Sequence, residues 1–132
     1  MTDMHFIKGT TLAGTSGRSK DVFNPATGLV VGSVPLANAS EVDAAVAAAK
    51  AALPGWANTP PAKRSQIMFK FRDLINQNLD KIAGLISGQH GKTLDDARGE
   101  VARGLEVVEF TCGIPHLLKG EYSAQVASAV DS

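Results

Sequence analysis

The sequence lacks an excess of charge of either sign. Its 132 residues contain 13 Lys and Arg against 13 Asp and Glu, which gives a formal net charge of zero. Proteins that bind nucleic acid or an anionic membrane surface usually carry a strong basic field. Neither nucleic acid nor a membrane is therefore an expected partner.

The sequence also has little cysteine and no long apolar run near its start. Its one cysteine, Cys112, offers no disulfide framework. The first residues, MTDMHFIKGTTLAG, contain no apolar stretch long enough for a signal sequence or a transmembrane helix. These absences predict a reducing, cytoplasmic compartment, with a removed organelle presequence as the alternative.

Turn signals every few positions predict short strands in hairpins over the first forty residues. Apolar runs lie at 5–8, 20–23 and 29–34. In the segment Asn24-Pro25-Ala26-Thr27-Gly28, the proline presets φ, the asparagine can bond the backbone two residues on, and the glycine accepts positive φ. We expect a structural turn there and assign it no function.

From Ser40 onward the apolar period changes to that of helices. The first predicted helix has Ser40 as its N-cap and ends at Pro54, and the second has Thr59 as its cap. A break is expected near Asn78. The next helix begins at Thr93, whose hydroxyl can act as the cap.

Each predicted helix has an apolar stripe at helical spacing, which is typical of a face that is buried. Trp56, Phe69 and Phe71 are likewise interpreted as core residues rather than ligand contacts. The stripes comprise Val42, Ala45, Val46, Ala49 and Leu53; then Ile67, Met68, Phe71, Leu74 and Ile75, continued by Leu79, Ile82, Ala83 and Ile86; and finally Ala97, Val101, Leu105, Val108 and Cys112.

These elements predict an α+β, helix-rich chain of short β-hairpins, then three or four helices and a terminal strand. The strands fall within 5–35 and the helices within about 41–118. Residues 122–132 are small and polar with weak alternation, so they are expected to form an edge strand or a disordered tail. One domain of this length can bury roughly two-thirds of the surface of the unfolded chain.

The Gly91-Lys92-Thr93 segment resembles part of a phosphate-binding loop but does not satisfy the motif. That loop requires a further glycine five residues before the Gly-Lys, between a strand and a helix, and the sequence has Ile86 there. The segment also follows a predicted helix. We therefore expect a turn between two helices, with Thr93 as the cap.

Cys112 is not expected to be a catalytic nucleophile. A reactive thiolate needs a nearby cation or a helix N-terminus and an exposed position. Cys112 instead lies on an apolar stripe near the C-terminal end of a predicted helix, where the dipole disfavours a thiolate. A buried structural thiol is the better interpretation. The three histidines are too scattered for a metal site, and none is proposed.

Arg103 is the one candidate for a functional side chain. It is offset from the apolar stripe of its helix, and Glu100 and Glu106 are placed to form i, i+3 ion pairs with it. From the residues alone, this is most simply a solvated helix face. Gly99 and Gly104 weaken the helix, which suggests close packing or the approach of a ligand.

Four motifs occur in register with a known family: NPATG at 24–28, GKT at 91–93, GEVARG at 99–104 and GIPHLLKGE at 113–121. From His5 to about Glu121 the chain resembles the N-terminal portion of the methylmalonate-semialdehyde dehydrogenases, the CoA-acylating branch of the aldehyde dehydrogenases. The resemblance implies an α/β parent fold. Within that fold, residues 1–121 would form the N-terminal part of the NAD-binding domain, and 122–132 the start of an oligomerisation arm.

The resemblance also implies a function for the complete enzyme. Such an enzyme oxidises methylmalonate or malonate semialdehyde with NAD, through a thioester that CoA intercepts. The arginine of the Gly-Glu-Val-x-Arg-Gly motif, here Arg103, would face the substrate tunnel and hold the substrate carboxylate. A guanidinium suits this role because it can bond a carboxylate through two parallel hydrogen bonds.

The family's nucleophilic cysteine, general-base glutamate and nicotinamide-binding loops would lie beyond residue 132. The chain alone is therefore expected to have no catalytic residue, to bind neither NAD nor CoA, and to be inactive. It is expected to self-associate or to pack against the remainder of the dehydrogenase fold. An independent helical binding or assembly module is the second interpretation, and a nucleotide-hydrolysing fragment is a distant third.

Overall fold

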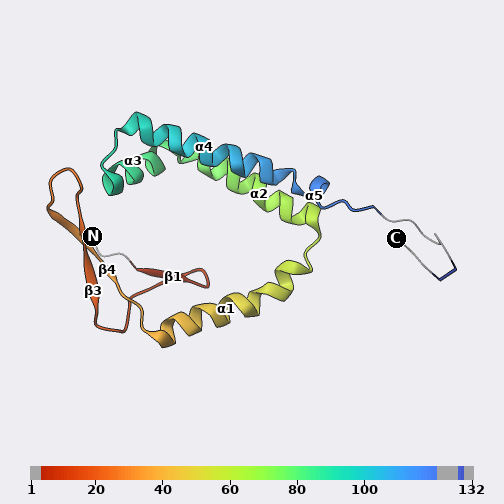
Figure 1. The fold of residues 1–132 in the computed structure, drawn as a ribbon, viewed down its shortest axis with the longest axis horizontal. Helices are drawn as coiled ribbons and strands as arrows, with labels where there is room; N and C mark the ends of the chain where they lie inside the picture. The colour runs from red at the N-terminus through yellow and green to blue at the C-terminus, as the bar shows by residue number, and fades with distance from the viewer. Residues whose placement is uncertain (1–3, 122–127, 130–132) are drawn as a thin grey trace. The chain divides into compact units, whose positions relative to one another are not determined.

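A computed structural model describes residues 4–121 and 128–129 (Figure 1). These residues form an α+β, helix-rich chain, which confirms the predicted fold class. The terminal strand that the sequence suggested near Tyr122 lies outside the described residues. The described part of the chain contains no helix with the length and apolarity needed to cross a membrane.

The chain divides into two compact units. Unit 1 contains the described residues of Met1–Thr59 and Leu79–Val101, and unit 2 contains those of Pro60–Asn78 and Ala102–Ser132. Helix α4 (Leu94–Cys112) begins in unit 1 and continues into unit 2.

Two antiparallel hairpins open unit 1. Strand β1 (His5–Ile7) pairs with β2 (Thr10–Leu12), and β3 (Ser19–Phe23) pairs with β4 (Val30–Pro35) (Figure 1). All four strands lie within the predicted range. Strand β2 was not singled out in the sequence because its three residues, Thr-Thr-Leu, are all exposed and show no alternation.

The turn between β3 and β4 has the predicted chemistry. The Asn24 side-chain oxygen accepts a hydrogen bond from the Ala26 N–H at 2.9 Å, and the Gly28 N–H donates to the Asn24 carbonyl at 2.8 Å. Gly28 has a φ of +71°, which residues other than glycine rarely adopt. The turn is therefore fixed by its own five residues.

Helix α1 (Ala39–Ala57) begins two residues earlier than predicted, with Asn38 rather than Ser40 as its N-cap. The Asn38 side chain accepts the Glu41 N–H at 2.9 Å, and the Glu41 carboxylate accepts the Asn38 N–H at 2.8 Å. This reciprocal capping box satisfies two N–H groups that have no partner within the helix. It explains why the prediction of Ser40 was wrong.

Glu41 also joins helix α1 to the segment between the two hairpins. Its carboxylate accepts the Thr15 N–H at 2.6 Å and the Thr15 hydroxyl at 2.9 Å. The hydrogen bonds from the Asn38 and Thr15 backbones hold the pKa of Glu41 below its ordinary value, because they stabilise the ionised form.

The predicted end of α1 at Pro54 was also wrong. The helix contains Pro54 and continues to Ala57, and the Asn58 N–H bonds to the Pro54 carbonyl at 3.1 Å. Thr59 does not cap the next helix, since its hydroxyl donates to the Gly55 carbonyl at 2.8 Å. Helix α2 (Pro61–Gln77) instead begins after Pro60, with no side-chain cap.

Helix α3 (Leu79–His90) follows the predicted break at Asn78, and the buried apolar residues of unit 1 lie on α3 and the start of α4. Ala83 and Ala97 are fully buried. Arg98 joins the two helices by bonding Asp80 at 2.8 Å, and it also bonds Asp95 at 2.9 Å. These bonds raise the pKa of Arg98, with the Asp80 bond as the larger cause.

The turn between α3 and α4 is the predicted helix-to-helix connection. Gly91 has a φ of +81°, and the Thr93 hydroxyl accepts the Asp96 N–H at 3.3 Å, which confirms Thr93 as the cap. A Cβ on Gly91 would lie 2.8 Å from Cγ of Pro25, so this turn packs closely against the β3–β4 turn. The two motifs GKT and NPATG therefore meet in unit 1.

Unit 2 is built from α2, the later part of α4, and α5 (Ile114–Leu117), a single turn after Gly113. With α5 included, the described residues form five helices, one more than the upper prediction of four. The α2 stripe is only partly covered in this chain, because Ile67 is 53% exposed and Phe71 is 47% exposed, whereas Met68 and Ile75 are half-buried. The opposing face of α2, which carries Ser65 and Arg72, packs toward α4 instead.

Candidate functional site

Helix α4 carries the candidate site residue, and its buried stripe is the one predicted. Ala97 and Val101 are buried in unit 1, and Cys112 is buried in unit 2. Leu105 and Val108 are half-buried between them. This stripe has the regular period of an amphipathic helix, and it fixes which side of α4 stays exposed.

Arg103 lies on the exposed side of α4. It is two residues after Val101 and nine before Cys112, so it points roughly 180° away from both around the helix axis. Its guanidinium forms no ion pair or hydrogen bond with the described residues. An exposed guanidinium without a protein partner can accept an anionic ligand without first breaking an existing pair.

The ion pairs expected between Arg103 and its two glutamate neighbours are not present among the described residues. Glu100 instead bonds the Lys92 ammonium at 2.6 Å, because the turn before α4 brings this lysine beside the helix. A Cβ on Gly104 would meet no atom of the described residues within 4 Å. Close packing within the described residues therefore does not explain Gly104.

Two contacts hold α4 against α2 within unit 2. The Ser65 hydroxyl donates to the Cys112 carbonyl at 2.7 Å, and this is a buried hydrogen bond. Arg72 bonds the Glu109 carboxylate through both Nε and Nη2 at 2.9 Å. The bond from Glu109, followed by that from Asp73, raises the pKa of Arg72. These contacts set the orientation of the helix that presents Arg103.

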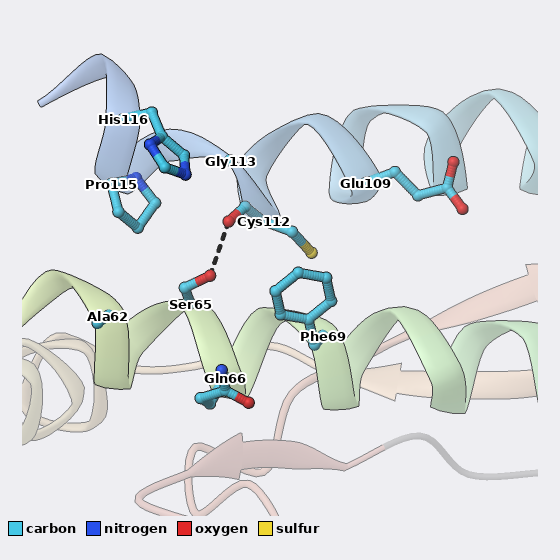
Figure 2. Close-up of a pocket in the computed structure, with 9 residues that line it drawn as sticks. All are labelled: Ala62, Ser65, Gln66, Phe69, Glu109, Cys112, Gly113, Pro115 and His116. Atoms are coloured by element: carbon cyan, nitrogen blue, oxygen red, sulfur yellow. Dashed lines mark hydrogen bonds between the residues drawn. The ribbon is translucent and has the colours of Figure 1, made fainter.

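A groove of about 460 Å³ lies between α2, the end of α4 and α5 (Figure 2). Figure 2 shows Phe69 and the Cys112 sulfur facing one another across it. The sequence did not predict this groove, because it forms only where residues far apart in the chain meet. Its lining comprises Ala62, Ser65, Gln66, Phe69, Glu109, Cys112, Gly113, Pro115 and His116.

The groove does not have the features of a catalytic site. Ser65 is bonded to a backbone carbonyl and Glu109 to Arg72, so neither is poised to activate a nucleophile. Cys112 is 7% exposed, and its thiol donates to the Val108 carbonyl at 3.4 Å. The thiol is therefore buried, as predicted. Arg103 does not line the groove.

The Gly91-Lys92-Thr93 segment connects two helices, as the sequence predicted. The Gly91-Lys92-Thr93 turn follows helix α3, and the Ser87 hydroxyl donates to the Lys92 carbonyl at 2.7 Å. A phosphate-binding loop would follow a strand. Across residues 4–121 and 128–129, no group of three or more His, Cys, Asp or Glu residues could hold a metal ion.

Comparison with known proteins decides the family. A family model described as the aldehyde dehydrogenase family matches residues 12–131. The chain belongs to the aldehyde dehydrogenase family. Malonate-semialdehyde dehydrogenase of Pseudomonas aeruginosa is 51% identical over 128 residues, which cover 97% of this chain and 26% of that enzyme.

Solved structures of aldehyde dehydrogenases match the fold closely. A protein assigned as a methylmalonate-semialdehyde dehydrogenase of Sinorhizobium meliloti, in complex with NAD, has a TM-score of 0.94 and 49% identity, covering 99% of this chain and 27% of that one. Methylmalonate-semialdehyde dehydrogenase of Oceanimonas doudoroffii has a TM-score of 0.92 and 47% identity, with the same coverage. The chain thus spans about a quarter of the length of these aldehyde dehydrogenases.

The described residues do not by themselves fit a dinucleotide. A dinucleotide site of the βαβ type needs parallel strands and a glycine-rich turn from a strand into a helix. Strands β1 to β4 pair as two antiparallel hairpins, and the Gly-Lys turn connects two helices.

Proposed function

We propose that this chain is the N-terminal portion of an NAD-dependent, CoA-acylating methylmalonate- or malonate-semialdehyde dehydrogenase. The observation that carries the proposal is the 51% identity to a malonate-semialdehyde dehydrogenase over 97% of the chain. The TM-score of 0.94 to an assigned methylmalonate-semialdehyde dehydrogenase supports it. The chemistry of aldehyde oxidation is assigned to the complete enzyme and not to this chain.

In this proposal Arg103 binds the carboxylate that distinguishes the semialdehydes from simple aldehydes. The exposed position of Arg103 on α4 and its lack of a partner among the described residues support the assignment. A guanidinium offers two parallel N–H donors to a carboxylate, which fixes the orientation of the substrate as well as its affinity. Ser65 and Arg72 contribute indirectly, because they hold α4 in place.

The chain also has a proposed place within the complete enzyme and within the cell. Residues 1–121 would belong to the NAD-binding domain and residues 122–132 to the start of the oligomerisation arm, while NAD and CoA would be bound by other parts of the enzyme. The single cysteine supports a reducing compartment, so we place the enzyme in the cytoplasm.

The full-length protein provides the direct test. Mixed with methylmalonate or malonate semialdehyde, NAD and CoA, it is expected to form NADH and the corresponding acyl-CoA, measured by absorbance and by mass spectrometry. The same assay without CoA separates acyl transfer from simple hydrolysis. If neither semialdehyde is oxidised while an unrelated aldehyde is, the assignment to this branch of the family is wrong.

The isolated chain is expected to self-associate. Several large apolar side chains on α1 and α2 are exposed, among them Leu53 at 59% and Ile67 at 53%. Burying each such side chain is worth roughly 1.5 to 3 kcal/mol, so leaving them in water favours association. Light scattering at micromolar concentration should show dimers or larger oligomers, and a hydrophobic dye should bind more strongly than to a native globular domain.

A matched pair of variants separates association through the exposed apolar side chains from non-specific association. Replacing Leu53 and Ile67 with Ser should shift the chain toward the monomer, whereas Lys20→Ser on exposed strand β3 should not. A compact monomer of the unchanged chain that binds no dye would contradict the prediction. That result would favour an independent helical module.

A further inference from the structure

Lys92 forms a partly buried ion pair with Glu100, which lies on the first part of α4. The Lys92 ammonium is 2.6 Å from the Glu100 carboxylate, and the Lys92 side chain is 19% exposed. Both residues belong to unit 1. A pair that is shielded from solvent is screened less by salt than a pair at the surface, so Lys92 neutralises much of the charge of Glu100.

The turn before α4 fixes the position of Lys92. Gly91 has a φ of +81°, and a Cβ there would lie 2.8 Å from Cγ of Pro25, so the turn is held against the β3–β4 turn. On its other side, the Ser87 hydroxyl donates to the Lys92 carbonyl at 2.7 Å. Because its backbone is already held, Lys92 loses less conformational freedom on pairing with Glu100 than a lysine in a mobile loop would lose.

Glu100 is also the acidic neighbour best placed to compete for Arg103. The two residues lie three positions apart on the continuous helix α4, a spacing at which an acid and a base form an ion pair. An acid that precedes the base is the favoured order, and helical side chains lean toward the N-terminus, so Arg103 leans toward Glu100 rather than toward Glu106. Arg103 nevertheless has no ion pair with a residue that the structure describes.

We propose that Lys92 is a positioning residue, which holds the Glu100 carboxylate and so leaves the Arg103 guanidinium available to the carboxylate of the substrate. Without Lys92, Glu100 would compete for the guanidinium and would also repel the anionic semialdehyde. The inference rests on the proposed function, because it requires Arg103 to bind that carboxylate. It goes further by giving the Gly-Lys turn a role beyond that of a connection between helices.

Steady-state kinetics of the full-length enzyme test the inference. The quantity measured is kcat/KM for malonate semialdehyde divided by kcat/KM for propanal, which has no carboxylate. In Lys92→Met this ratio should fall roughly three- to tenfold, because Glu100 is released beside Arg103 and its charge is no longer neutralised. The double variant Lys92→Met/Glu100→Gln should recover the ratio to within about twofold of the parent enzyme, because the competing carboxylate is gone.

Lys81→Met is the matched control. It removes the same charge from an exposed lysine of unit 1 that has no ion pair with a described residue, so the ratio should stay unchanged. Lys92→Gln, which can still donate a hydrogen bond to Glu100, replaces Lys92→Met if the latter does not fold, and it should lower the ratio in the same direction.

Three results would overturn the inference. The first is an unchanged ratio in a folded Lys92 variant, which includes an equal loss for both aldehydes. The second is a fall in the ratio that Glu100→Gln does not reverse. The third is a failure of both Lys92 variants to fold, which would make Lys92 a residue of structural importance only.

Arg103→Leu separates a failure of the inference from a failure of the proposed function. This variant should lower the same ratio, and adding Lys92→Met to it should have little further effect, because Lys92 acts through Arg103. If Arg103→Leu leaves the ratio unchanged, the proposed role of Arg103 is wrong, and the inference fails with it. If Arg103→Leu lowers the ratio and Lys92→Met does not, the proposed function stands and only the inference is refuted.

Discussion

Purified on its own, the 132-residue chain is expected to form no NADH from methylmalonate semialdehyde, malonate semialdehyde or propanal. Aldehyde oxidation by this chemistry requires an activated thiolate, a base and a bound nicotinamide. Cys112, the one thiol, is buried with its hydrogen bonded to the Val108 carbonyl. The described strands form antiparallel hairpins rather than a dinucleotide fold. The expected rate is therefore that of the assay without protein.

Two controls make this result interpretable. The full-length protein, assayed in parallel, shows that the substrates and cofactors are competent. Cys112→Ser identifies any thiol-dependent turnover by the chain. Activity that survives repurification and disappears in Cys112→Ser would make Cys112 a nucleophile and would refute the structural interpretation of this residue.

In the full-length enzyme, Arg103→Leu is expected to lower kcat/KM for methylmalonate semialdehyde. The expected loss of transition-state binding energy is about 2 to 4 kcal/mol, which is typical of breaking a charge-assisted pair. This corresponds to a loss of roughly 30- to 900-fold. Propanal has no carboxylate, so its kcat/KM should change little. The decisive measurement is the ratio of the two values in the variant and the parent enzyme.

Further variants separate the role of Arg103 from damage to helix α4. Arg103→Lys keeps the charge but loses the two-donor geometry, so it should recover only part of the discrimination. Arg72→Leu removes the contact to Glu109 and should affect both aldehydes by a similar factor. Equal losses for both aldehydes in Arg103→Leu would indicate a disturbed helix and would contradict carboxylate binding.

Much of the candidate site could be predicted from the sequence, because the site lies on one helix. The stripe from Ala97 to Cys112 follows the helical period, so it identified the buried side of α4 and the exposed position of Arg103. The carboxylate-binding role came from the resemblance of the GEVARG motif to a known family.

The groove beside α4 could not be predicted from the sequence in this way. It requires Phe69 on α2 to face Cys112 on α4, across more than forty intervening residues. The sequence interpreted Phe69 and Trp56 as core residues, yet both are about half-exposed. The apolar character of a side chain predicts a tendency to be buried, whereas actual burial depends on a neighbouring element that packs over it.

Local hydrogen bonding and helical period were determined by the sequence itself. The turn from Asn24 to Gly28, the Thr93 cap and the Cys112 stripe depend on neighbouring residues or on residues one helical turn apart. The start of α1 is local as well, because the Asn38–Glu41 capping box spans only three residues. Tertiary structure decided the packed face of α2, which the contacts of Ser65 and Arg72 turn toward α4. That face depends on partners distant in sequence, whose positions no local pattern specifies.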